Sequence, residues 1–196
     1  MTKFHFPTFH EMFPVEKRKL KLLREWLRYR VRRLVFATQC RALVNFIHEN
    51  PLWQPVFAQY PYRVNTLLSQ YCDKHFNVTQ RLDAIKTNFA MAEKHFGVAL
   101  CETLISQQPV LLAQLTDELA LNLTLNHIDP YEGFFAIALT DANQRTIYSA
   151  SFTFLADNRL LIASIQGPKG DEAQDLVRQA TKLLHGVRPL KFLRRR

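Results

Sequence analysis

The spacing of apolar residues changes near Pro109, and this change limits the chain to folds that combine helices with a separate sheet. From residue 15 to residue 108, apolar side chains recur every three or four positions, which is typical of amphipathic helices. Beyond Pro109 they alternate with polar residues, which is typical of half-buried strands. We therefore predict an α+β fold, with a helical N-terminal half packed on an antiparallel β-meander that is followed by a helix.

Caps and prolines place the predicted helices of the N-terminal half. A long helix should run from about residue 17 towards residue 50, with a break near residues 37–38 and a stop at Pro51. A second helix should begin after an N-cap at Thr79 and end at Gly97, and a short helix should follow to about residue 106. Between them, four side chains are expected in the core: Leu52, Trp53, Phe57 and Tyr60.

Three or four short strands are predicted in the C-terminal half, at residues 119–125, 132–141, 145–155 and 159–166. A loop over residues 166–170 then leads to a helix that Asp171 should cap and Gly186 should end. For the domain organisation we expect an N-terminal segment (residues 1–15) and a single domain (residues 16–196), which is helical over residues 16–108 and holds the meander and helix over residues 109–196.

Composition excludes several classes of protein. The 196 residues are 47% hydrophobic and 22% charged, which argues against disorder. No window approaches the ~18 consecutive apolar residues of a membrane span, and the N-terminus has no apolar signal-peptide region. The three cysteines form no C-x-x-C pair and the seven histidines show no ligand spacing. We therefore expect a cytoplasmic protein with reduced thiols and no metal site.

Positive charge is concentrated at two ends of a nearly neutral chain. Residues 17–33 carry nine Lys and Arg side chains against Glu25 alone, and the last six residues carry four more. The first stretch is also amphipathic, because five apolar residues recur along it at helical spacing. They are Leu20, Leu23, Leu27, Val31 and Leu34.

This basic stretch has two interpretations. In the first, the apolar stripe packs on the body of the protein and the basic residues form a solvated face. In the second, the helix binds an anionic membrane surface at the inner membrane. The candidate surface residues are Lys17, Arg18, Lys21, Arg24, Arg28 and Arg32. Nucleic acid is a less favoured partner, because no nucleic-acid-binding motif accompanies the charge.

Four motifs in the C-terminal half resemble the VirK/YbjX family of bacterial proteins. They are Tyr131-Glu132-Gly133, Ile147-Tyr148-x-x-Ser151-Phe152, Ile165-Gln166-Gly167-Pro168 and Thr181-Lys182-x-Leu184-His185-Gly186-Val187-Arg188-Pro189. The resemblance is looser over the helical half, at Tyr60-Pro61-Tyr62-Arg63 and Arg81-Leu82. It implies an accessory protein linked to envelope homeostasis, virulence and tolerance of cationic antimicrobial peptides, with a protein partner of unknown identity. Family members continue beyond the Arg-Pro pair, so we expect this chain to lack their C-terminal third.

The loop before the last helix is the candidate ligand site. A glycine-containing loop that leads to a helix N-terminus can present backbone N–H groups to a phosphate. The meander, loop and helix also resemble the acyl-coenzyme A-binding core of acetyltransferases, although Lys169 stands where their first loop glycine belongs. The candidate anion or coenzyme A residues are Gln166, Gly167, Lys169, Gly170 and Arg188. The alternatives are an acyl-coenzyme A-dependent acyltransferase, incomplete in this form, and a tight turn with no cofactor.

One further cluster could support acid–base chemistry. His127, Asp129 and Glu132 lie close together in a loop, and a loop histidine titrates near neutrality. The alternative is a solvated histidine beside an Asp-Pro turn. The sequence assigns no catalytic residue, and whether the protein is an enzyme stays open between these alternatives. A nucleic-acid-associated stress protein is the third and weakest functional hypothesis.

Overall fold

The sheet is an antiparallel meander whose five strands are hydrogen-bonded in the order of the chain. The computed structural model describes residues 3–13 and 19–189. The strands are β1 (Val110–Thr116), β2 (Leu119–Leu125), β3 (Phe135–Asp141), β4 (Thr146–Leu155) and β5 (Arg159–Gln166). The four predicted strands are confirmed. β1 was missed because Leu111 and Leu112 are adjacent and both exposed, so this edge strand shows no simple alternation.

The helical half also follows the prediction closely. Its helices are α1 (Phe9–Met12), α2 (Lys19–Val35), α3 (Ala37–Glu49), α4 (Gln54–Ala58), α5 (Asn65–Leu68), α6 (Val78–Phe96) and α7 (Val98–Ile105), with short 3-10 turns η1 (Pro51–Trp53) and η2 (Pro61–Val64). The predicted long helix breaks at Phe36, between α2 and α3. The predicted cap at Thr79 is wrong, because Asn77 and Gln80 bond each other's backbone N–H groups in a capping box.

Aromatic side chains form the centre of the core between the helices and the sheet. Trp53 and Phe57 of the irregular segment are fully buried, as predicted, whereas Tyr60 is 38% exposed. The ring of Phe89 on α6 lies 4.5 Å from that of Trp53 and 5.0 Å from that of Phe134. Helix and sheet are also joined by a hydrogen bond, because the backbone N–H of Phe154 donates to Asn88 Oδ1 at 2.9 Å.

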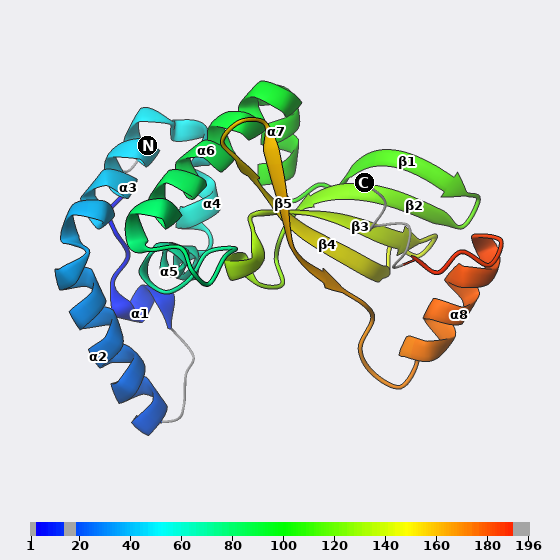
Figure 1. The fold of residues 1–196 in the computed structure, drawn as a ribbon, viewed down its shortest axis with the longest axis horizontal. Helices are drawn as coiled ribbons and strands as arrows, with labels where there is room; N and C mark the ends of the chain where they lie inside the picture. The colour runs from blue at the N-terminus through cyan, green and yellow to red at the C-terminus, as the bar shows by residue number, and fades with distance from the viewer. Residues whose placement is uncertain (1–2, 14–18, 190–196) are drawn as a thin grey trace.

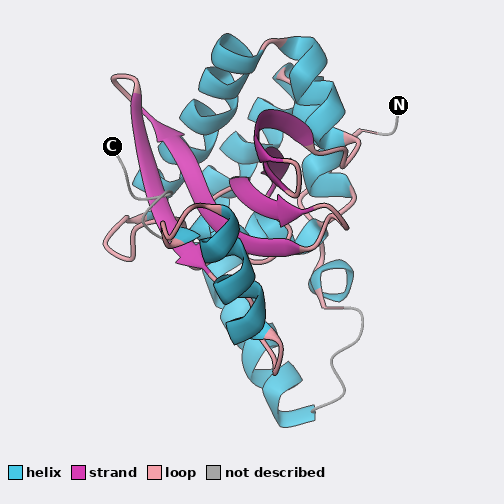
Figure 2. Ribbon diagram, turned by 90° about the vertical axis from the view of Figure 1, so that its right-hand side faces the viewer, coloured by secondary structure: helices cyan, strands magenta, loops and turns pink. Residues whose placement is uncertain are grey.

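One face of the sheet is covered by two separate groups of helices. Alternation places the four leucines of β2 on the same face. Leu123 and Leu125 join the main helical core, while Leu119 packs with Ala180 and Leu184 beside the last helix, α8 (Ala173–Leu183). Figure 1 accordingly shows helices α1–α6 at one end of the molecule and α8 at the other. Viewed from that second end, α8 lies in front of the strands and the helical layer behind them (Figure 2).

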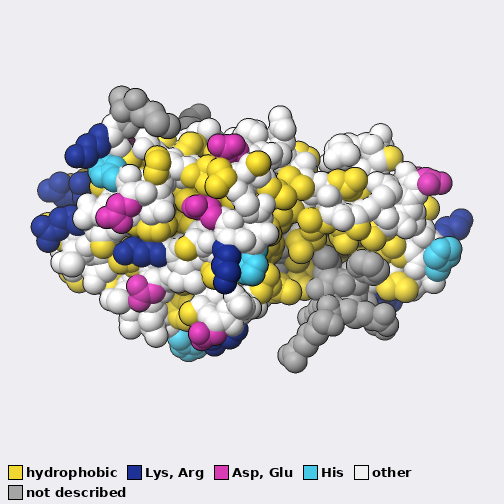
Figure 3. All heavy atoms as spheres, turned by 90° about the horizontal axis from the view of Figure 1, so that it is seen from above, with side chains coloured by type: hydrophobic (Ala, Val, Ile, Leu, Met, Phe, Trp, Pro, Cys, Tyr) yellow, Lys and Arg dark blue, Asp and Glu magenta, His cyan; other side chains and the backbone are white. Residues whose placement is uncertain are grey.

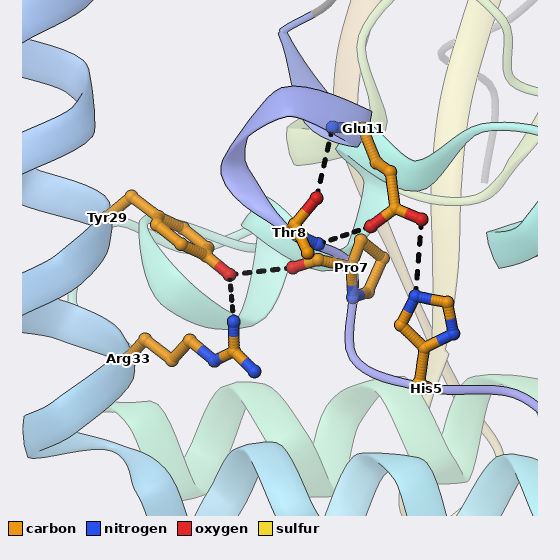
Figure 4. A network of polar contacts seen from close by, with 6 residues as sticks. All are labelled: His5, Pro7, Thr8, Glu11, Tyr29 and Arg33. Atoms are coloured by element: carbon orange, nitrogen blue, oxygen red, sulfur yellow. Dashed lines mark hydrogen bonds and ion pairs between the residues drawn. The ribbon is translucent and has the colours of Figure 1, made fainter.

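The N-terminal segment is fixed against α2 by the polar network of Figure 4. The buried Tyr29 hydroxyl donates to the carbonyl oxygen of Pro7 at 2.7 Å, and Arg33 Nη1 donates to the same hydroxyl at 2.7 Å. Thr8 and Glu11 form a capping box at the start of α1. Four apolar side chains of this segment are buried in the main core: Phe4, Phe6, Phe9 and Met12.

We expect Tyr29→Phe to lower the free energy of unfolding by about 1–2 kcal/mol, because the carbonyl of Pro7 and the Arg33 guanidinium both lose a partner. Chemical denaturation would measure the loss. Tyr148→Phe is the matched control, since its hydroxyl makes no hydrogen bond to any residue of 3–13 or 19–189. Equal losses in the two variants would show that the network of Figure 4 contributes nothing specific.

Candidate functional site

The predicted apolar stripe of α2 faces solvent. Its residues are Leu20, Leu23, Leu27, Val31 and Leu34, with exposed fractions from 51% at Val31 to 85% at Leu20. The interpretation that the stripe packs on the body is therefore wrong. The body is instead contacted by the opposite side of the helix, through Leu22 and Tyr29. The start of α2 also projects beyond the rest of the helical layer in both Figure 1 and Figure 2.

Basic side chains flank this exposed stripe. Arg24 and Arg28 are exposed and both lie near Glu25, with N–O distances of 3.4 and 3.0 Å. The Arg30 guanidinium lies 5.4 Å from the centre of the Trp26 ring. Figure 3 shows Lys and Arg gathered at the helical end of the molecule. We call the exposed stripe together with Lys21, Arg24, Arg28 and Arg30 the outer face of α2.

Two of the predicted surface residues cannot be placed, and one lies apart from the outer face. Lys17 and Arg18 lie outside the described residues. Arg32 is half-buried and its Nη1 donates to Ser69 Oγ at 3.0 Å, so it connects α2 to the residue that follows α5. Within the described ranges, no helix is long and apolar enough to cross a bilayer.

The structure separates the residues of the predicted loop site. Gln166 Nε2 donates to Glu132 Oε2 at 2.7 Å, while Lys169 and Gly170 are exposed. The predicted cap at Asp171 is wrong, because the N-cap of α8 is Glu172, which makes no side-chain capping bond. The loop thus presents two carboxylates at the start of α8, where they oppose an incoming anion.

Gly167 lies against Tyr148, and Arg188 lines a cavity together with that tyrosine. A Cβ at position 167 would lie 3.1 Å from Cε1 of the Tyr148 ring, so glycine allows the loop to cross that ring closely. Tyr148 also lines a cavity of about 490 Å³ beside α8. Three basic side chains line this cavity: Arg178, Lys182 and Arg188. We call it the α8 cavity.

The acid–base cluster predicted from the sequence is not assembled. The backbone N–H of Tyr131 donates to Asp129 Oδ1 at 2.9 Å, and Glu132 accepts from Gln166. His127 instead lies beside the Tyr60 ring, with centroids 5.8 Å apart. The Glu132–Gln166 bond nevertheless joins two of the motifs that carried the family resemblance, at the end of the sheet where β5 leaves it.

The cysteines are free thiols. Cys40 and Cys101 are buried, and burial raises the pKa of each to about 11. Burial also raises the pKa of Cys72 to about 12. Within the part of the chain that the structure describes, no three His, Cys, Asp or Glu residues are grouped so that they could hold a metal ion. Burial thus disfavours the thiolate, which is the nucleophilic form of cysteine.

The fold and its surface define a class: an α+β protein in which a helical layer and α8 cover one face of an antiparallel meander, with an exposed basic amphipathic helix. The chain belongs to the family described as a protein of unknown function, DUF535, which is the VirK/YbjX family. The family model matches residues 18–195. The resemblance seen in the motifs is thereby confirmed. No solved structure matches the chain.

Two relatives come from Haemophilus influenzae, and both are uncharacterised proteins. One is 48% identical over 192 residues, covering 97% of this chain and 66% of the relative, and the other is 25% identical over 189 residues, covering 96% and 63%. The chain thus spans slightly less than two-thirds of their length. A third relative, "Membrane protein LapB" of Mannheimia haemolytica, is 28% identical over 187 residues, covering 95% of this chain and 81% of that protein.

Proposed function

We propose that this VirK/YbjX-type protein binds the anionic cytoplasmic surface of the inner membrane through the outer face of α2. From there it would serve envelope homeostasis, virulence and tolerance of cationic antimicrobial peptides, the roles that the family resemblance implies. The observation that carries the proposal is the exposure of an apolar stripe between basic side chains. The printed name of the LapB relative, a membrane protein, supports it.

The apolar stripe and the basic side chains of this surface match the hydrocarbon and the anionic headgroups of a bilayer interface. Burying one apolar side chain from water contributes ~1.5–3 kcal/mol when burial is complete, and the stripe offers five. Each Lys or Arg near an anionic surface adds ~1 kcal/mol, and this attraction weakens with salt. Because the inner side of α2 already contacts the body, the helix can lie flat on a membrane without leaving the fold.

Co-sedimentation with lipid vesicles tests the proposal. We expect the protein to pellet with phosphatidylglycerol-containing vesicles at physiological salt and to remain in solution with pure phosphatidylcholine vesicles. The double substitution R24E/R28E should reduce the bound fraction at least tenfold, because two charges beside the stripe change sign and the net charge falls by four units. K74E/K94E makes the same charge change at exposed positions outside α2 and should retain binding. Equal binding to both lipids, or equal losses in both variants, would contradict the proposal.

An acyl-coenzyme A-dependent transferase activity is a second candidate, and the α8 cavity favours it. Lys182 and Arg188 form no ion pair with any described residue, and both line the cavity beside Tyr148. Two cations that no described acid pairs with suit the pyrophosphate of coenzyme A. The carboxylates of Asp171 and Glu172 at the start of α8 stand against it, since they repel an anion there.

We expect acetyl-coenzyme A, if it binds the α8 cavity, to raise the melting temperature of the protein. A ligand at 100 times its Kd stabilises the native state by about 2.7 kcal/mol. K182Q/R188Q should abolish the rise, whereas Lys94→Gln, at an exposed position on α6, should leave it unchanged. A flat melting temperature at millimolar acetyl-coenzyme A would exclude this second function for the chain.

A further inference from the structure

Arg63 is a buried cation that forms no ion pair with any residue that the structure describes. Only 4% of its surface is exposed, and it lies on η2 next to the sheet. Nη1 donates to the carbonyl oxygen of Val56 at 3.2 Å and Nη2 to that of Asn126 at 3.0 Å. No carboxylate of residues 3–13 or 19–189 lies within 4.0 Å of the guanidinium. Two carbonyl dipoles therefore solvate its charge, and no carboxylate of the described residues neutralises it.

An uncompensated buried charge is unusual enough to require a reason. Desolvation of a single ion costs several kcal/mol unless a counter-ion offsets it. The same burial lowers the pKa of Arg63 to about 10, so the group is still a cation at neutral pH. The Tyr60 ring, 4.7 Å from the guanidinium carbon, adds a cation–π contact that stabilises the charge without cancelling it.

Arg63 also borders an open cavity. The cavity has a volume of about 330 Å³, and among the described side chains that line it Arg63 is the only Lys or Arg. Tyr60, Tyr62 and Tyr131 form its aromatic walls, and His127 lies at its exposed side. Asp129 is the only acidic residue among the described lining residues, and its Oδ1 accepts the backbone N–H of Tyr131.

The walls of the cavity are held in place by hydrogen bonds. The hydroxyls of Tyr62 and Tyr131 lie 2.8 Å apart, and Asn65 Nδ2 donates to the Tyr131 hydroxyl at 2.9 Å. The loop on the other side is fixed by Asn126, whose Nδ2 donates to the carbonyl oxygens of Asp129 and Gly133 at 2.7 and 2.9 Å. A cavity fixed in this way is preorganised for a ligand, which lowers the entropy cost of binding.

We propose that this cavity binds a small molecule bearing a carboxylate or phosphate group, with its oxyanion on the Arg63 guanidinium. Such a group supplies the missing counter-charge, and a guanidinium has five donors of which two hydrogen bonds are already made. The tyrosines provide hydroxyl donors and apolar ring faces for the rest of the ligand. The site shares no residue with the outer face of α2, so this proposal can be tested independently of membrane binding.

His127 provides a direct readout of binding. Its pKa lies below the ordinary value, first because of burial and second because of the positive charge of Arg63. An oxyanion on Arg63 removes part of this repulsion and should raise the pKa of His127. By reciprocity, a rise of one unit requires about tenfold tighter anion binding with His127 protonated than with it neutral.

The experiment is an NMR titration of the histidine side chains with sodium sulfate and with sodium benzoate, at constant ionic strength set by chloride. Neither anion titrates between pH 5 and pH 8, so the pKa change belongs to the protein. We expect saturable binding and a higher pKa for His127, with exposed His95 on α6 as an internal control. Tighter binding of sulfate indicates a phosphate-type ligand, and tighter binding of benzoate indicates a carboxylate.

Variants locate the binding in the cavity. Arg63→Met should abolish it, and Ile128→Glu, at an exposed lining position, should weaken it about fivefold to tenfold by adding negative charge. Ile162→Glu is the matched control at an exposed position on β5 outside the cavity. If Arg63→Met does not fold, the pair I128E and I162E decides the question. Absence of binding by both anions, or binding equally affected by I128E and I162E, would overturn the proposal.

Discussion

Gly133→Ala is expected to destabilise the protein by about 4 kcal/mol, a large part of the ~5–15 kcal/mol that stabilises a typical domain. Gly133 is buried between η3 (Pro130–Glu132) and β3, with φ at +121° and ψ at 158°. L side chains rarely adopt this conformation, and forcing one into it costs about 1–3 kcal/mol. A Cβ there would also lie within 2.7 Å of the carbonyl carbon of Phe152, so the backbone of β4 must move.

The matched control for this clash is Gly97→Ala. Gly97 ends α6 with φ at +76° and ψ at 160°, in the same glycine region of backbone space, but nothing lies within 4 Å of the position where its Cβ would stand. Gly97→Ala should therefore lower the free energy of unfolding only by the cost of the backbone conformation, about 1–3 kcal/mol. Urea denaturation of both variants separates the cost of the backbone conformation from the cost of the steric overlap with β4. If Gly133→Ala lowers the free energy of unfolding no more than Gly97→Ala does, the β4 backbone accommodates the added Cβ at little cost.

Gly133 also belongs to a motif that was recognised in the sequence although its structural role was unknown. Tyr131-Glu132-Gly133 was recognised as a family motif, and the structure gives each residue a separate contact. The Tyr131 hydroxyl contacts Tyr62, Glu132 accepts from Gln166, and Gly133 lets the β4 backbone pass closely. These contacts join segments that are 69, 34 and 19 residues apart. Local sequence patterns do not encode such separations, so the motif could be recognised but its role could not be derived.

The elements of the fold were easier to predict than the surfaces they present. Alternation along β2 and the stop at Pro51 are local signals, and both gave the right boundaries within a few residues. The failures at Thr79 and Asp171 were choices among neighbouring polar residues that can all cap a helix. β1 was missed because an exposed edge strand needs no buried alternating face.

For α2 the sequence predicted the helix and its two kinds of side chain correctly, but not which side meets the body. The leucine and valine stripe is the more apolar side, and it faces solvent. The body is contacted through Tyr29, whose ring lies near Phe9 and whose hydroxyl bonds Pro7. This side of α2 meets both the N-terminal segment and the residue that follows α5, and the positions of these segments depend on tertiary contacts. Likewise, the isolation of Arg63 from every described acid is a property of the assembled core alone.

Phe89→Ala should cost about 3–5 kcal/mol, while Leu27→Ala should change the free energy of unfolding by less than about 0.5 kcal/mol. Phe89 is fully buried among Trp53, Phe57 and Phe134, so its removal leaves a cavity that these rings cannot fill. Leu27 exposes 56% of its surface, and alanine is an equally good helix former.

The same pair of variants separates folding from function. Leu27→Ala should weaken binding to anionic vesicles several-fold at unchanged stability, because the side chain would be buried only in the membrane. Phe89→Ala, measured at a temperature where it is still folded, should bind vesicles as the unmodified protein does. Denaturation curves and vesicle co-sedimentation give a free energy of unfolding and a vesicle-bound fraction for each variant. A loss of stability in Leu27→Ala comparable to that in Phe89→Ala would mean that the stripe packs within the protein, and the outer face of α2 would then have no role at a membrane.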